Sequence, residues 1–182
     1  MRKQIEQIER LLERQTNQKE RDLAKRYAGL LLAIQSVLGE FYRRYETDGK
    51  LTYVEVIKYD RLQRLNKEIV ELINDEDKAL HREIVSHLED QYQESFYRVA
   101  HAIETIAQAK LNYSAVRREV LDEAVNIDFT GLTLNERLER RRQELIYNMR
   151  EAIVRGLHQG KTYRQMANDI KDELEGDLAK AQ

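Results

Sequence analysis

Apolar residues recur at steps of three and four from the start of the chain, which is the pattern of an amphipathic helix. The first apolar stripe comprises Ile5, Ile8, Leu12, Leu23, Tyr27, Leu30, Ile34, Leu38, Phe41 and Tyr45. It predicts one unusually long helix that runs into the mid-40s. The polar stretch RQTNQKERD, Arg14 to Asp22, interrupts this stripe. Residues 1–22 are therefore expected to form a projecting or frayed helical arm.

The next part of the chain predicts two more long helices. A turn is expected at TDGK, residues 47–50. Thr52 and Glu55 then have the spacing of a capping box, which opens a helix whose apolar stripe ends at Leu72. The acidic sequence NDED, residues 74–77, is expected to break the chain before the third helix.

The third predicted helix carries about eight turns of apolar face, from Leu80 to Ile106. We expect this helix to pack in one core with the hairpin from Phe41 to Ile69. Ser114 is expected to cap a short helix behind it. The sequence NIDFTGL, residues 126–132, is the least helical stretch and predicts a loop.

Two more capping boxes mark the last two predicted helices. Thr133 with Glu136 opens a helix that ends at His158 or Gln159, and Gly160 follows where a left-handed cap is expected. Thr162 with Gln165 opens the last helix, which is expected to reach Glu175 before Gly176.

Long helices joined by short breaks favour antiparallel neighbours. We therefore predict an all-α fold in which long amphipathic helices pack as an elongated antiparallel helical bundle or hairpin. Three parts are expected: the arm at 1–22, a long-helix bundle at 23–125 and a C-terminal helical segment at 126–182.

Composition supports the all-α class and removes several kinds of chemistry. The 182 residues include no proline and only seven glycines, which disfavours the turn-rich sandwiches, barrels and Rossmann folds. The absence of cysteine excludes disulfides, cysteine nucleophiles and thiolate zinc sites. The longest apolar run, residues 28–34, is far shorter than the roughly 20 residues of a membrane span.

No arrangement of residues predicts catalysis, a cofactor or a metal. Gly156 and Gly160 precede Lys161 and Thr162, but a P-loop has four residues between its glycines and follows a strand. We interpret Gly160 as a helix stop and Thr162 as a helix start. None of the four histidines has a glutamate three residues before it, as helical di-metal sites require. The chain is predicted not to be an enzyme.

Charge is distributed unevenly although the net charge is only −2. Between residues 137 and 164 eight basic residues stand against three acidic ones, whereas residues 66–94 are strongly acidic. The basic helix is a candidate to follow a nucleic-acid backbone or, alternatively, to dock on the acidic helices of this chain or a second copy. The candidate contact residues are Arg137, Arg140, Arg141, Arg142, Arg150, Arg155, Lys161 and Arg164.

Four stretches resemble the amino-terminal part of the phage head-morphogenesis, or minor capsid (minor head), proteins of tailed phages. They occur in the same order and spacing as in that family, at residues 41–69, 89–104, 130–138 and 156–174. In that family the last helix runs on into a further segment, so the resemblance implies that this chain is a fragment. Some relatives carry an ADP-ribosyltransferase-like domain further along.

The resemblance implies a low-copy structural protein in the interior of the virion head, present in the host cytoplasm during assembly. Its implied partners are the portal and other capsid proteins, with non-specific contact to packaged DNA and a homo-oligomer as further expectations. The implied roles are procapsid assembly and genome delivery. Two alternatives remain open: a helical adaptor unrelated to virions, and the helical leader of a larger toxin enzyme.

Overall fold

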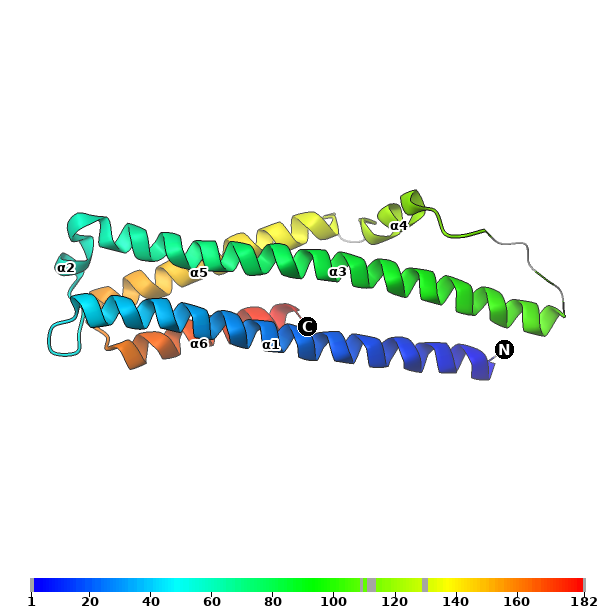
Figure 1. The fold of residues 1–182 in the computed structure, drawn as a ribbon, viewed down its shortest axis with the longest axis horizontal. Coiled ribbons are helices and arrows are strands. Elements are labelled where there is room, and N and C mark those ends of the chain that lie inside the picture. The colour runs from blue at the N-terminus through cyan, green and yellow to red at the C-terminus, as the bar shows by residue number, and fades with distance from the viewer. Residues whose placement is uncertain (1, 109, 111–113, 129–130, 182) are drawn as a thin grey trace. The chain divides into compact units, whose positions relative to one another are not determined.

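The computed structural model describes residues 2–108, 110, 114–128 and 131–181, and confirms the all-α class (Figure 1). In chain order its elements are α1 (Arg2–Tyr45), α2 (Tyr53–Ile57), the 3₁₀ turn η1 (Lys58–Asp60), α3 (Arg61–Ala107), α4 (Arg118–Val125), α5 (Leu134–His158) and α6 (Tyr163–Ala181). The described residues form no sheet, only isolated bridges that join Lys50 to Thr47 and to Thr162.

The chain divides into two compact units, and the long helices α1 and α3 each contribute to both. The hairpin unit comprises residues 1–21 and 80–138, and the bundle unit comprises residues 22–79 and 139–182. The domain division expected from the sequence stays a prediction.

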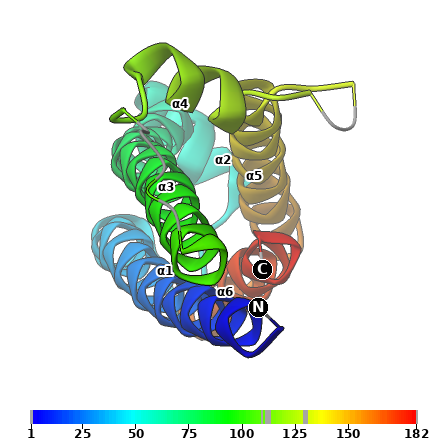
Figure 2. The same cartoon turned by 90° about the vertical axis from the view of Figure 1, so that its right-hand side faces the viewer.

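In the bundle unit, four helices run alternately in opposite directions around one core (Figures 1 and 2). Side-chain contacts join each neighbouring pair: α1 with α3, α3 with α5, α5 with α6, and α6 with α1. The predicted stripe at Leu30, Ile34 and Leu38 is buried here. The core also includes Tyr42, Leu51, Val56, Leu65, Ile69, Ile73, Leu145, Met149, Ile153, Leu157, Met166, Ile170 and Leu174.

In the hairpin unit, the beginning of α1 lies antiparallel to the end of α3. Polar contacts join the two helices, including Gln15 to Glu94 at 2.7 Å and Lys19 to Glu83 at 3.1 Å. The residues expected to form a projecting or frayed arm are thus helical from Arg2 onward. This unit has a thin core, because its buried apolar residues among those described are Leu80, Ala100, Leu121 and Leu138.

The predicted chain break at residues 74–77 is wrong, because α3 passes through the acidic sequence without interruption. Its carboxylates have partners from other helices: Arg26 of α1 pairs with Glu76 at 2.9 Å, and Arg142 of α5 lies 3.8 Å from Asp77. These ion pairs favour the helix over a turn. The break falls instead at η1, where Asp60 has a φ of 55°.

Two other predicted boundaries also differ. Ser114 does not cap α4, which has Arg117 at its N-cap; the Val116 amide before it donates to the Tyr97 hydroxyl. Helix α6 does not stop before Gly176 but runs to Ala181. The predicted loop at 126–132 is non-helical at its described positions, and Phe129 and Thr130 lie outside the described residues.

The two later capping boxes are confirmed as reciprocal hydrogen bonds. The Thr133 amide donates to the Glu136 carboxylate at 2.8 Å, and the Glu136 amide donates to the Thr133 hydroxyl at 3.3 Å. The bond from the Thr133 amide, and then a 2.8 Å bond from the Thr133 hydroxyl to the same carboxylate, hold the pKa of Glu136 below its usual value. Thr162 and Gln165 make the same exchange.

The first capping box is only half formed. Thr52 caps α2 by accepting from the Glu55 amide, as predicted. The Glu55 carboxylate does not return to the Thr52 amide, because it pairs with Lys58 and Arg61.

The glycine-containing turn between α5 and α6 ends one helix and starts the next. Gly160 has a φ of +62°, and the Lys161 amide donates to the Gly156 carbonyl at 3.0 Å, which closes the end of α5. At Gly156 the Met166 side chain of α6 fills the space that a Cβ would need. Each glycine therefore has a structural role that explains its presence.

Candidate functional site: the basic helix α5 and the start of α6

The structure divides the eight candidate contact residues into two groups. Four of them pair with carboxylates: Arg141, Arg142, Arg155 and Lys161. The other four are exposed and form no ion pair with any described residue: Arg137, Arg140, Arg150 and Arg164.

Arg141 belongs to a polar cluster inside the bundle unit. Its Nη2 lies 2.8 Å from Oδ2 of Asp177, a carboxylate whose side chain is only 8% exposed. The Tyr27 hydroxyl donates to the same oxygen at 2.6 Å and accepts from Arg141. The cluster therefore links α1, α5 and α6, and Arg141 serves the fold.

Sequence reasoning overlooked the carboxylate of this cluster. Asp177 continues the apolar positions Met166, Ile170 and Leu174 of α6 at helical spacing. Among the described residues, it is the one polar or charged residue that is buried. The sequence signal for this buried carboxylate was a charged residue in line with an apolar stripe. Its partners, Tyr27 and Arg141, lie in other helices, so the sequence around Asp177 does not identify them.

Arg142 falls on the apolar stripe of α5 and is half-buried. Its Nη1 donates to Oδ1 of Asn74 at 2.8 Å, and its Nη2 donates to Glu139 at 2.6 Å. Asn74 and the nearby Asp77 belong to the acidic stretch of α3. For this residue, the arrangement matches docking on the acidic helix of the same chain.

Arg155 and Lys161 pair with carboxylates of α6. Arg155 lies 3.7 Å from Glu173, and Lys161 donates to Asp169 at 2.6 Å. These contacts neutralise part of the local positive charge.

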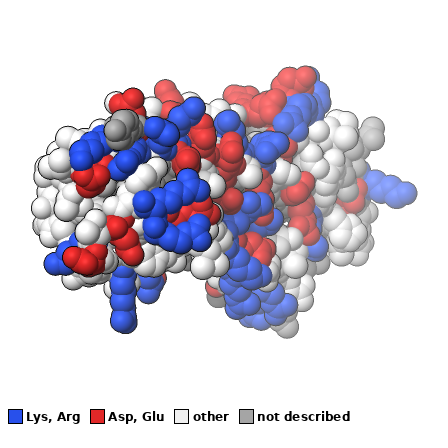
Figure 3. All heavy atoms as spheres, turned by 60° about the vertical axis from the view of Figure 1, so that its left-hand side comes forward, with Lys and Arg blue, Asp and Glu red and all other residues white. Residues whose placement is uncertain are grey.

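The exposed surface is correspondingly mixed in charge. Arg140 and Arg150 are exposed along α5, but Glu144 and Glu151 are exposed on the same helix. On the face drawn in Figure 3, basic and acidic side chains lie among one another. The basic run in the sequence therefore becomes a set of separate arginines in the structure.

Tyr42 connects α1 to the turn between α5 and α6. Its ring is buried, and its hydroxyl donates to the Lys161 carbonyl at 2.8 Å. Burial, and then the carboxylates of Glu46 and Asp169, raise the pKa of Tyr42 from 10.0 to about 12. The neutral phenol is thus the form that the folded protein holds.

Alkaline pH should therefore destabilise the bundle unit through Tyr42. Because the folded pKa is raised, its stabilising contribution is complete below pH 10 and is lost as the pH rises towards 12. Ultraviolet titration should show a phenol that ionises near pH 12, and this ionisation should disappear in Tyr42→Phe. Urea unfolding at pH 8 should give a loss of about 1 kcal/mol in that variant. A titration curve unchanged by the substitution would contradict this assignment.

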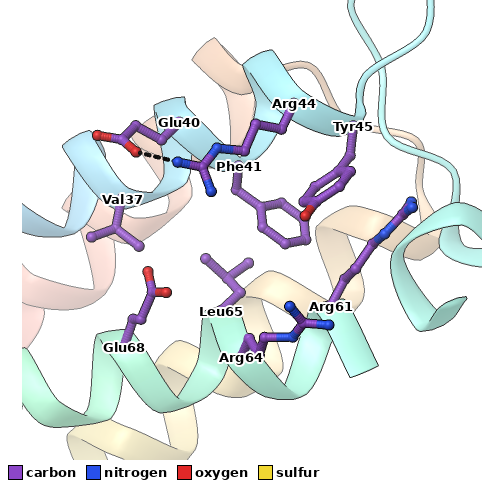
Figure 4. A pocket seen from close by; sticks show the side chains of 9 residues that line it. All are labelled: Val37, Glu40, Phe41, Arg44, Tyr45, Arg61, Arg64, Leu65 and Glu68. Carbon is purple, nitrogen blue, oxygen red and sulfur yellow. Dashed lines mark hydrogen bonds and ion pairs between the residues drawn. The ribbon is translucent and has the colours of Figure 1, made fainter. Parts of the chain in front are cut away.

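A cleft of about 340 Å³ lies between α1 and α3 in the bundle unit (Figure 4). Val37, Phe41 and Leu65 provide its apolar lining, and the charged residues around it are Glu40, Arg44, Arg61, Arg64 and Glu68. Sequence reasoning missed this cleft, because it exists only where two helices meet.

The guanidinium groups of the cleft are already engaged. Arg44 pairs with Glu40 at 3.2 Å, and Arg61 lies 4.2 Å from the centre of the Tyr45 ring while donating to the Glu55 carbonyl. No group of three metal-ligating side chains occurs in the described part of the chain. None of its described helices is both long and apolar enough to cross a membrane.

The chain has sequence similarity to known proteins. The chain is 32% identical over 176 residues to minor head protein GP7 of Bacillus phage SPP1, a match that covers 97% of this chain and 57% of that protein. The predicted resemblance to phage minor head proteins is confirmed. No family model matches the chain, and no solved structure matches it significantly.

A second similarity is more distant. The chain is 24% identical over 136 residues to the NAD(+)–arginine ADP-ribosyltransferase EFV of Enterococcus faecalis. This match covers 75% of this chain and 28% of that enzyme. The chain thus spans a little over half of the minor head protein and about a quarter of the enzyme.

Proposed function

We propose that this chain is part of a minor structural protein of a phage head and has no catalytic activity of its own. The observation that carries the proposal is the 32% identity to a phage minor head protein along 97% of the chain. In this role it contacts the portal and other capsid proteins and acts in procapsid assembly and genome delivery. It resides in the head interior, after passing through the host cytoplasm during assembly.

The architecture is compatible with such a role. The bundle unit has a continuous apolar core, and its cluster of Tyr27, Arg141 and Asp177 joins three helices, which favours a rigid unit. Large apolar side chains of the hairpin unit remain exposed, and these are features of a surface that binds proteins.

The test is the composition of heads made by the encoding phage. Purified heads should contain the gene product in low copy number by quantitative mass spectrometry. A stop codon early in the gene should remove the protein and reduce infectivity, and a plasmid copy should restore both. Pull-down of the purified chain with the portal protein, using the major capsid protein in parallel, tests the partners. If purified heads of the parent phage lack the protein, the proposal is wrong.

Non-specific DNA contact is part of this proposal, and we expect the exposed arginines to make it. At 50 mM salt the chain should bind duplex DNA weakly, and binding should fall roughly 40-fold at 200 mM salt if three phosphates are neutralised. Changing Arg140, Arg150 and Arg164 to glutamate should abolish binding without loss of helicity, because none of them pairs with a described residue.

The matched control changes Arg10, Arg21 and Arg43, which are also exposed, to glutamate. This control alters net charge equally and should retain most of the binding. Equal losses in the two triple variants would show that net charge, and not the α5–α6 surface, governs binding. No binding by the parent at 50 mM salt would exclude DNA contact by this chain.

The second candidate function is the helical leader of a larger enzyme, favoured by the similarity to the ADP-ribosyltransferase. Incubating the complete gene product with labelled NAD⁺ and an arginine-containing acceptor separates the two functions. Transfer of label would favour the enzyme, and its absence together with incorporation into heads would favour the structural protein.

A further inference from the structure

Helix α3 carries an exposed apolar stripe in the hairpin unit. Its members are separated by steps of four, three, four and three, which is the spacing of a coiled-coil seam. Each of these side chains is between 39% and 46% exposed: Tyr92, Phe96, Val99, Ile103 and Ile106. Five large apolar residues in one row are more than the scattered exposure of an ordinary surface.

Helices α1 and α3 belong to both units, but they are covered by other helices to different extents in each. In the bundle unit, α5 and α6 complete a four-helix core over α1 and α3. In the hairpin unit the other described helical segments are α4, with only eight residues, and the start of α5 at residues 134–138; Arg118 of α4 pairs with Glu89, just before the stripe. Among the described residues, no further helix of the hairpin unit covers positions 92–106.

The residues beside the stripe indicate what fits on it. In a coiled coil, the positions flanking the seam select partners by charge. Here these positions carry no charge and are mostly small: Gln93, Ser95, Ala100, Ala102 and Ala107. A strongly acidic or basic partner helix would find no complementary charge there. An identical helix would meet no like-charge repulsion and could approach closely.

We propose that the stripe at 92–106 packs against the same stripe of a second copy of this chain. Two hairpin units then form a symmetric four-helix interface, in which residues of one copy meet the equivalent surface of the other. Each copy supplies apolar cover to side chains that are 39% to 46% exposed in the other copy. The thin core of this unit gains most from such cover, since small units bury a low fraction of their apolar surface.

Light scattering after size-exclusion chromatography tests this pairing on the full chain. The parent should show about twice its monomer mass of 21.7 kDa, with dissociation on dilution. The double variant Val99→Glu with Ile103→Glu should weaken association at least ~10-fold, because it places four charges in the paired seam. The control Leu32→Glu with Tyr147→Glu changes two other exposed apolar residues, both in the bundle unit, and should remain dimeric.

The glutamate variant tests the pairing only if circular dichroism shows that it is as helical as the parent. If the glutamate variant loses helicity, the uncharged variant Val99→Ser with Ile103→Ser replaces it and should also shift towards monomer. A parent that stays monomeric at its highest soluble concentration would overturn the proposal. A dimer that neither stripe variant weakens would overturn it as well, because association would then use another surface.

Discussion

Replacing Asp177 with alanine is expected to lower the free energy of unfolding by about 3 kcal/mol, because it leaves the Arg141 guanidinium without its buried partner. The Asp177 side chain is 8% exposed and that of Arg141 is 20% exposed, so little water can replace the lost carboxylate. The Tyr27 hydroxyl loses its acceptor at the same time. Urea unfolding followed by circular dichroism measures the loss.

The double variant Asp177→Leu with Arg141→Met is the control for this prediction. It removes both charges and fills the space with apolar groups, so it should be much closer to the parent in stability. Tyr27→Phe should cost only about 1 kcal/mol, since it removes one hydrogen-bonding group. A loss below 1 kcal/mol for Asp177→Ala would show that solvent reaches Arg141 after the substitution.

Leu65→Ala is expected to destabilise the bundle unit by about 2 to 5 kcal/mol, because Leu65 is 2% exposed in the core. Ile84→Ala should cost less than about 2 kcal/mol, since Ile84 is only half-buried and the site can relax. The sequence predicts that these two residues belong to one core. The structure corrects that expectation, because they belong to different compact units.

Both variants require the same measurement, which is urea unfolding monitored by helicity. Leu32→Ala, at a strongly exposed position of α1, provides a baseline close to zero. Equal losses at Leu65 and Ile84 would indicate that the hairpin unit buries more apolar surface in solution than this structure shows.

The helices of this protein are predictable because their apolar stripes are local and periodic. Leu30, Ile34 and Leu38 mark a core face from sequence alone, and they are fully or almost fully buried. The break expected at residues 74–77 could not be judged in this way. Its acidic residues are stabilised in the helix by Arg26 and Arg142, which lie far away in the sequence.

The candidate site shows the same limit more sharply. Arg140 and Arg141 are adjacent in sequence, yet one is exposed without an ion-pair partner among the described residues and the other joins a buried cluster. A step of one residue turns a side chain by about 100° around a helix, so neighbours face different surroundings. Composition identified a basic segment, but only the packing of α5 against α1, α3 and α6 tells which charges are available.

The uneven burial along α1 and α3 has a consequence for how the molecule opens. Residues 22–45 of α1 face a dense core, whereas its residues 2–21 belong to the thinly packed hairpin unit. Local stability follows buried contacts rather than the length of a hydrogen-bonded helix. We therefore expect one continuous helix to span two foldons: its first half should exchange amide protons through low-energy opening, and its second half should stay protected until the bundle itself unfolds.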